Sequence, residues 1–172
     1  MKILYIVRHA KSSWKFPDMR DIERPLNRRG KRDAPEMAQF IGNMISPPDI
    51  FLSSPSKRTY ETAQHFLAVF GTDDSSLTIT HDLYHASASS WKHIITHIPD
   101  ENNSAMLFGH NPGVTDFVNE LTNKKIYNIP TCGVACIQLD IDHWEQLQKG
   151  SCLLYTSPSP RDLSTSRMPS SA

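Results

Sequence analysis

The sequence predicts a single α/β domain whose mostly parallel sheet is covered by helices on both faces. Short apolar runs alternate with amphipathic segments of about a dozen residues, which is the first indication. Connections of this length between strands are typical of right-handed crossovers, and these place helices on both faces of a parallel sheet. The length of 172 residues suits one domain with a sizeable core.

Five apolar runs are predicted as strands. The first and the fourth are continuous apolar runs, as in buried strands, the second is short, and the last alternates as in a half-buried strand. In chain order they are residues 3–7, 49–52, 77–83, 105–108 and 134–141.

Four segments have apolar residues at helical spacing and are predicted as helices. The first contains Pro35, which a helix tolerates only in its first turn. The fourth opens with the turn sequence Asn111-Pro112-Gly113. In chain order they are residues 30–45, 57–70, 89–98 and 113–121.

The charge balance argues against nucleic acid or a membrane surface as the main partner, because 18 basic and 18 acidic residues give a net charge of zero. No run reaches the length of a membrane span, and the N-terminal apolar run is too short for a signal peptide. We therefore expect a cytoplasmic protein. Cys132 and Cys136 are interpreted as small core residues rather than a zinc site.

The C-terminal end differs from the rest in composition. Of the 21 residues 152–172, 11 are Ser, Thr or Pro. We expect residues 1–151 to form the domain and residues 152–172 to be a tail translated from vector or adapter sequence, the alternative being a native disordered tail. The apolar start of this tail, Cys152–Tyr155, could take the place of a final strand.

Charged and imidazole side chains follow three of the predicted strands. Arg8 and His9 come after the first, Arg58 after the second and His110 after the fourth, and Arg24 is a further candidate. In sheets of this kind, ligands bind at the carboxyl ends of the strands. Several guanidinium groups facing one point repel each other unless a dianion lies between them, and their planar fork matches phosphate oxygens.

A phosphoryl group explains the histidines as well. A neutral imidazole is a competent nucleophile that forms a covalent phosphohistidine, which water then hydrolyses. One ring nitrogen must face phosphorus while the other donates to a backbone carbonyl. His9 suits this role, and we expect His110 to hydrogen-bond the transferring oxygens. Arginines supply the positive charge, so no metal ion or other cofactor is required.

Four motifs occur in an order that resembles the histidine phosphatase superfamily, specifically its SixA-like phosphohistidine phosphatase branch. They are "VRHAKSSW", "RPLNRRG", "SSPSKRTYETA" and "GHNPG", with "LYHAS" and "IPTCGVA" in further support. The resemblance covers residues 1 to 151 and implies a three-layer α/β/α fold like that of phosphoglycerate mutases. It implies His9 as the phosphorylated nucleophile. It further implies a phosphate pocket of Arg8, Arg58 and His110, joined by Arg24 and Asn111.

One departure from that family bears on the substrate. Many members carry an acidic proton donor after the third strand, but this chain reads Leu83-Tyr84-His85-Ala86 there, with no carboxylate. Imidazole leaves more easily than an alkoxide, so the absence favours phosphohistidine over an alkyl phosphate ester. His85 or Asp18 could still donate a proton.

Three functions remain open from the sequence. The first is a phosphatase of phosphohistidine on a protein, such as a phosphotransfer domain. The second is a phosphatase of a small phosphorylated metabolite or coenzyme. The third is a binding module that holds a phosphorylated partner without turnover. The basic residues 28–32 are expected to be a solvated helix start that could also dock an acidic protein, and Trp14 could line the mouth of the pocket.

Overall fold

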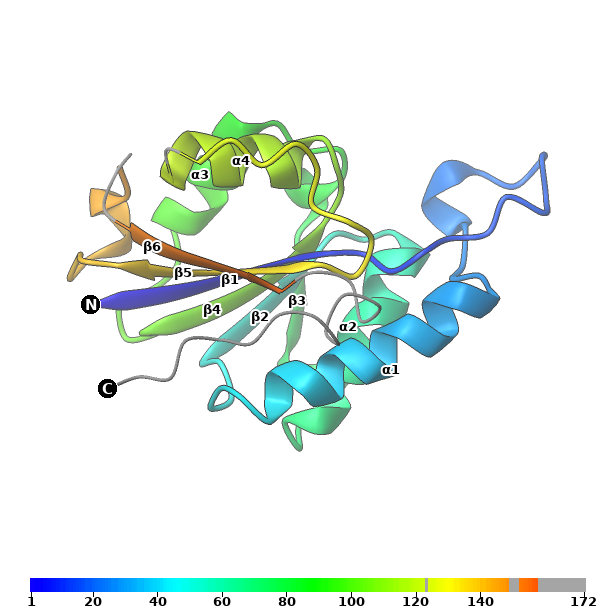
Figure 1. Cartoon of the computed structure of the whole chain (residues 1–172), viewed down its shortest axis with the longest axis horizontal. Coiled ribbons are helices and arrows are strands. Elements are labelled where there is room, and N and C mark those ends of the chain that lie inside the picture. The colour runs from blue at the N-terminus through cyan, green and yellow to red at the C-terminus, as the bar shows by residue number, and fades with distance from the viewer. Residues whose placement is uncertain (123, 149–151, 158–172) are drawn as a thin grey trace.

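The computed structural model describes residues 1–122, 124–148 and 152–157, and the rest of the expected tail, 158–172, lies outside the described residues. Its centre is a six-stranded sheet in the order β3-β2-β4-β1-β5-β6 (Figure 1). Strands β1 to β4 pair in parallel, whereas β5 is antiparallel to β1 and β6 is antiparallel to β5. The strands are β1 Lys2–Arg8, β2 Ile50–Ser53, β3 Leu77–Ile79, β4 Ser104–Gly109, β5 Val134–Leu139 and β6 Cys152–Ser157.

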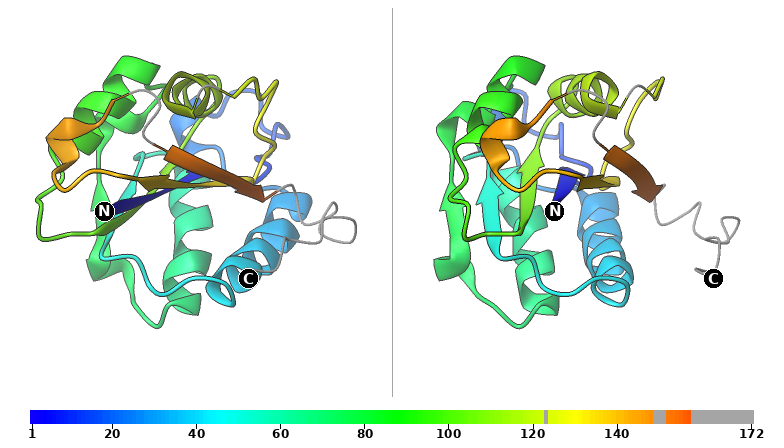
Figure 2. Two further views of the ribbon diagram at one scale, coloured as in Figure 1. Left: turned by 60° about the vertical axis from the view of Figure 1, so that its left-hand side comes forward. Right: turned by 90° about the vertical axis from the view of Figure 1, so that its left-hand side faces the viewer.

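Helices cover both faces of this sheet, which confirms the three-layer α/β/α prediction. Helices α1 and α2 lie together on one face, and α3 and α4 on the other (Figures 1 and 2). The helices are α1 Arg28–Gly42, α2 Lys57–Val69, α3 Ala88–Thr96 and α4 Gly113–Thr122. Across the described residues, none of the helices has the length and apolar character needed to cross a membrane.

Strand β1 shows how the sequence builds the two cores. Its side chains alternate between the faces, so Leu4 and Ile6 join the core under α3 and α4, while Tyr5 and Val7 join the core under α1 and α2. All four are at most 6% exposed. A run of consecutive apolar residues is therefore what a strand between two helical layers requires.

Helix α1 differs from its prediction. Asn27 caps it by accepting a hydrogen bond from the Gly30 amide, so the helix begins at Arg28. Pro35 consequently lies in the helix interior rather than in its first turn, where it removes one backbone hydrogen bond. Burial of Ala34, Met37, Ala38 and Ile41 along the same face offsets that cost.

The two ends of the sheet also refine the prediction. At one end, β3 spans only Leu77–Ile79, because His81–Leu83 turns into a short 3-10 helix. At the other end, β6 pairs with all six residues of β5. The backbone of Cys152–Ser157 thus occupies the place expected for a final strand, and β5 is not left as an open edge.

Candidate active site

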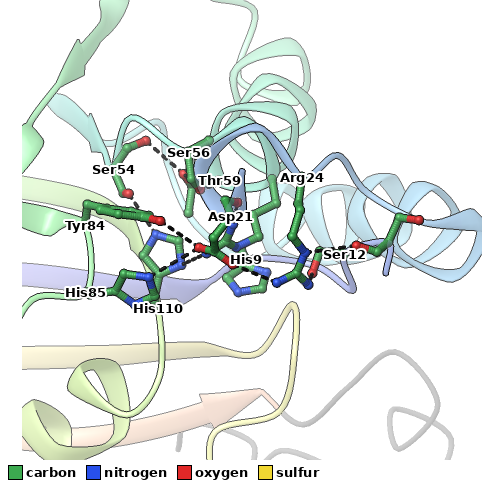
Figure 3. Close-up of polar contacts among 12 residues, drawn as sticks. His9, Ser12, Asp21, Arg24, Ser54, Ser56, Thr59, Tyr84, His85 and His110 are labelled. Carbon is green, nitrogen blue, oxygen red and sulfur yellow. Dashed lines mark hydrogen bonds and ion pairs between the residues drawn. The ribbon is translucent and has the colours of Figure 1, made fainter. Parts of the chain in front are cut away.

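Three strand ends meet at one point of the sheet. In the parallel register Arg8 lies opposite Gly109, and Ser53 lies opposite Phe108. The residues that follow, His9, His110 and Ser54, are therefore brought together. His9 and His110 border a cavity of about 270 Å³. Figure 3 shows the polar contacts of several side chains at this place. The lining residues of the cavity are Arg8, His9, Lys11, Ser12, Trp14, Asp21, Arg24, Arg58, His85, His110, Asn111 and Thr131.

His9 is held with one ring nitrogen free. Its Nδ1 lies 2.7 Å from the carbonyl oxygen of Ala10, and a carbonyl only accepts, so Nδ1 carries the proton. Burial, together with the charges of Arg58, Arg8 and Arg24, lowers the pKa of His9 to about 3 and outweighs the hydrogen bond to Ala10, which raises it. The ring is therefore neutral at pH 7, and Nε2 keeps the lone pair that a nucleophile needs.

His110 stands beside His9, with 5.1 Å between the ring centroids. Arg58 Nη2 donates to His110 Nδ1 at 3.3 Å, so His110 Nε2 carries the proton and donates to Ser54 Oγ at 2.8 Å. Both nitrogens are thus engaged with the protein, and the expected hydrogen bond to transferring oxygens requires Nδ1 to gain a proton. Burial and neighbouring positive groups lower the pKa of His110 to about 2, which a bound dianion would reverse.

The arginines take different positions around the cavity. Arg58 comes from the first turn of α2, and its side chain is 4% exposed. Arg8 donates to Ile129 O at 2.6 Å and to Asn128 Oδ1 at 3.1 Å, while its buried Nε has no hydrogen-bond partner in the described part of the chain. An unpartnered buried donor at the cavity wall is consistent with an anionic ligand.

Arg24 is a buried member of the same pocket. It donates to Ser12 Oγ at 2.6 Å and to Ser13 O at 3.0 Å. The ring of Trp14 lies over its guanidinium, 3.3 Å from the ring centroid. Trp14 is 74% exposed, so it forms the outer wall of the cavity, as expected from the sequence.

Asp21 lines the cavity but was not a candidate from the sequence. Its carboxylate accepts from Arg58 at 2.8 Å and from Arg24 and Tyr84 at 2.7 Å each, with His85 Nε2 at 3.3 Å (Figure 3). Burial favours the neutral acid, but the hydrogen bonds from Tyr84, Arg58 and Arg24 outweigh it and hold the pKa of Asp21 well below its usual range. The spacing of Asp21 and Arg24, an acid three residues before a base, was the available signal.

The remaining candidates divide between the cavity and the surface. His85 lines the cavity, and Asn111 lines it while donating to Asn128 Oδ1 at 2.7 Å. Asp18 is exposed and is not among the residues that line the cavity, so the structure does not bring it together with the other candidates. From the stretch after β3, His85 lines the cavity and no carboxylate does, whereas Asp21 brings a carboxylate from the loop after β1.

The glycines of "GHNPG" are selected by close packing rather than by backbone conformation. Neither Gly109 nor Gly113 has a positive φ, so no left-handed turn requires them. A Cβ at Gly109 would collide with the ring of Trp91, and a Cβ at Gly113 with the carbonyl oxygen of Ala86. Close packing therefore selects glycine at both positions, at the end of β4 against Trp91 of α3 and at the start of α4 against the segment before α3.

Other polar clusters carry no comparable geometry. Among the described residues, no group of three His, Cys, Asp or Glu side chains is arranged to hold a metal ion. Cys132 is fully buried and Cys136 partly buried, and both pack in the core on the α1 side, as their spacing suggested.

Together, the fold and the cavity define a phosphoryl-binding α/β protein with a positioned histidine. The profile of the Histidine phosphatase superfamily (branch 1) matches residues 4–114. The chain belongs to this family and is a phosphatase.

Two similar proteins are 31% and 29% identical to this chain over the aligned residues. An uncharacterised chloroplastic protein of Arabidopsis thaliana is 31% identical over 152 residues, which are 83% of this chain and 69% of that protein. The crystal structure of a proposed phosphohistidine phosphatase SixA from Agrobacterium tumefaciens is 29% identical with a TM-score of 0.73, covering 81% of this chain and 92% of that one.

The same fold occurs in a phosphatase of a different substrate. A phosphoserine phosphatase from Entamoeba histolytica, in complex with phosphoserine, has a TM-score of 0.64 at 17% identity. The alignment covers 95% of this chain and 100% of that one. Likeness at this level shows the fold alone.

Proposed function

We propose that this phosphatase hydrolyses phosphohistidine on a protein, without a metal ion, through a phosphohistidine intermediate on His9. The observation that carries the proposal is the fixed tautomer of His9, whose Nδ1 is held by Ala10 O at 2.7 Å while the ring lines a cavity with three arginines. Tautomer and position together leave Nε2 as the group that can attack phosphorus.

The reaction has two steps. In the first, the His9 Nε2 lone pair forms a bond to phosphorus as the phosphorus–nitrogen bond of the substrate breaks, and the leaving imidazole takes up a proton. In the second, water attacks the phosphorus of phospho-His9, that phosphorus–nitrogen bond breaks, and inorganic phosphate leaves. Arg8 and Arg58 stabilise the charge on the equatorial oxygens in both steps.

The preference for phosphohistidine follows from the proton donors of the cavity. Asp21 is ionised and already accepts from its neighbours, so it is a poor acid in the free protein. His85, half exposed at the cavity wall, is the remaining proton source from the sequence analysis. A weak acid suffices for an imidazole leaving group but not for an alkoxide.

A small phosphorylated metabolite or coenzyme is the second candidate. The phosphoserine phosphatase with the same fold favours it, because that fold also accommodates a small phosphate ester. The complete set of His9, Arg8, Arg58 and His110 in one cavity argues against a binding module without turnover. The cytoplasmic location stays a prediction.

A substrate panel tests the proposal. The wild-type protein and His9→Ala are assayed with phosphoramidate, a phosphohistidine peptide and small alkyl phosphates, each with and without a chelator. We expect wild type to prefer the phosphorus–nitrogen substrates and His9→Ala to be inactive. An alkaline quench should trap labelled phosphate on wild type only, because phosphohistidine is acid-labile. Retained activity of His9→Ala, or loss of wild-type activity on adding chelator, would contradict the mechanism, and a strong preference for esters would favour the second candidate.

A further inference from the structure

A groove of about 580 Å³ lies beside the cavity of the candidate active site. The two hollows share one wall, because Ser12 and Trp14 line the cavity while Ser13 and Lys15 line the groove. Successive side chains of this segment therefore face opposite sides. The groove is lined by Ser13, Lys15, Phe16, Pro25, Leu26, Asn27, Arg28, Arg29 and Lys31.

The groove carries positive charge that the protein itself leaves uncompensated. Lys15, Arg28 and Lys31 are exposed, and none of them has an ion pair within the described residues. Arg29, in contrast, pairs with Asp33 at 3.0 Å. The N-terminus of the 15-residue helix α1 also opens here and adds to the positive potential. This concentration of charge stands out in a chain whose net charge is zero.

The groove also offers apolar contact. Phe16 is 59% exposed at its edge, and the buried Leu26 lies in its floor. A mixture of unpaired basic side chains around an exposed aromatic ring fits a protein segment with carboxylates and an apolar residue better than it fits a uniform polyanion.

We propose that this groove docks an acidic segment of the phosphorylated partner protein, next to the phosphohistidine that enters the cavity. The inference rests on the proposed function and adds the surface that the partner must present. Because the cavity and the groove share a wall, a substrate protein that reaches His9 lies across the groove. Opposite charge there accelerates encounter and holds the partner in register.

The test compares two phosphohistidine peptides, one flanked by glutamates and one by glutamines, with phosphoramidate as the small substrate. The groove variant is Lys15→Glu/Lys31→Glu. The control variant is Lys92→Glu/Lys124→Glu, which changes the net charge equally at exposed positions outside both hollows. Binding of both peptides is also measured in the His9→Ala background, so that docking is read without turnover.

We expect the groove variant to lose about tenfold in kcat/KM for the glutamate peptide and to show a weaker salt dependence. The kcat/KM of the groove variant for the glutamine peptide and for phosphoramidate should stay within about twofold of wild type. The same holds for the control variant with all three substrates. The docking proposal would be overturned if wild type bound and hydrolysed the two peptides equally well. It would also be overturned if the groove variant and the control variant lost kcat/KM for the glutamate peptide to the same extent. A single-stranded oligonucleotide that competes as well as the glutamate peptide would overturn the class of partner.

Failure of the phosphatase proposal gives a different pattern. One outcome is that wild type hydrolyses neither phosphoramidate nor the peptides but binds the glutamate peptide more tightly than the glutamine peptide, and that the groove variant lacks this preference. In that case the docking proposal is supported and the proposed reaction is wrong. If neither preference nor turnover is found, both are wrong.

Discussion

Asp21 pairs with Arg58, the arginine that we also expect to bind the phosphoryl group. The charge of Asp21 should therefore stabilise the folded protein and weaken the binding of an anionic ligand. Asp21→Asn keeps the shape of the side chain and removes the charge. In the free protein, Arg58 and Arg24, with side chains 4% and 8% exposed, lose their carboxylate partner. Charge-assisted hydrogen bonds contribute about 1.5–3 kcal/mol each, but Asp21 is 38% exposed, so we expect the free energy of unfolding to fall by only about 1–2 kcal/mol.

Binding of a tetrahedral dianion should improve in the same variant. A dianion held by Arg58 would lie about 5–6 Å from the Asp21 carboxylate, and at that separation the repulsion is on the order of 1.5 kcal/mol in a water-like environment. Its removal corresponds to a gain of about tenfold in affinity. The assay is calorimetric titration with tungstate, paired with urea unfolding of the same samples.

Glu23→Gln is the matched control, because Glu23 is an exposed carboxylate on the same loop that pairs with Arg20 at 2.7 Å outside the cavity. We expect its stability to change by less than about 0.5 kcal/mol and its tungstate affinity to stay the same. Weaker binding of tungstate by Asp21→Asn would refute the reasoning, since it would show that Asp21 orients Arg58 for the ligand rather than competing with it.

Two further predictions concern the buried groups of the site. The pKa values of His9 and His110 lie near 3 and 2 in the folded protein, so the unfolded state binds more protons below pH 6.5. As the pH is lowered from 6.5, the free energy of unfolding should therefore decrease, by up to about 1.4 kcal/mol per pH unit for each histidine. His110→Gln should roughly halve this slope in urea unfolding between pH 6.5 and 4.5, and an unchanged slope would contradict it. Gly113→Ala should cost about 1–3 kcal/mol in the same assay, since its Cβ meets Ala86 O, and a cost near zero would contradict the close packing.

The order of elements could be predicted because its signal is local. A run such as residues 3–7 has the composition of a strand buried on both faces, and helical spacing within residues 57–70 needs no knowledge of neighbours. The boundaries were less accessible, since they depend on capping. Asn27 starts α1 early and leaves Pro35 inside the helix, and the turn at His81–Leu83 ends β3.

The site shows the same division between local and distant information. His9, Arg58 and His110 follow strands whose ends must meet, so their convergence could be predicted from the fold class. The hydrogen bond from Arg8 to Asn128 could not be predicted, because Asn128 lies 120 residues away on an irregular loop. For Asp21 the local signal was its spacing from Arg24, and it was missed because its other donors, Arg58 and Tyr84, come from separate segments.

The loop between β1 and α1 contributes to chemistry and to substrate choice at once. It carries Asp21 and Arg24 into the cavity, and it presents Lys15 and Phe16 to the groove. A small phosphoramidate samples only the cavity, whereas a phosphorylated protein samples both hollows. The ratio of the two kcat/KM values therefore isolates the groove, and a substitution that changes this ratio without changing phosphoramidate turnover acts on partner selection rather than on the reaction.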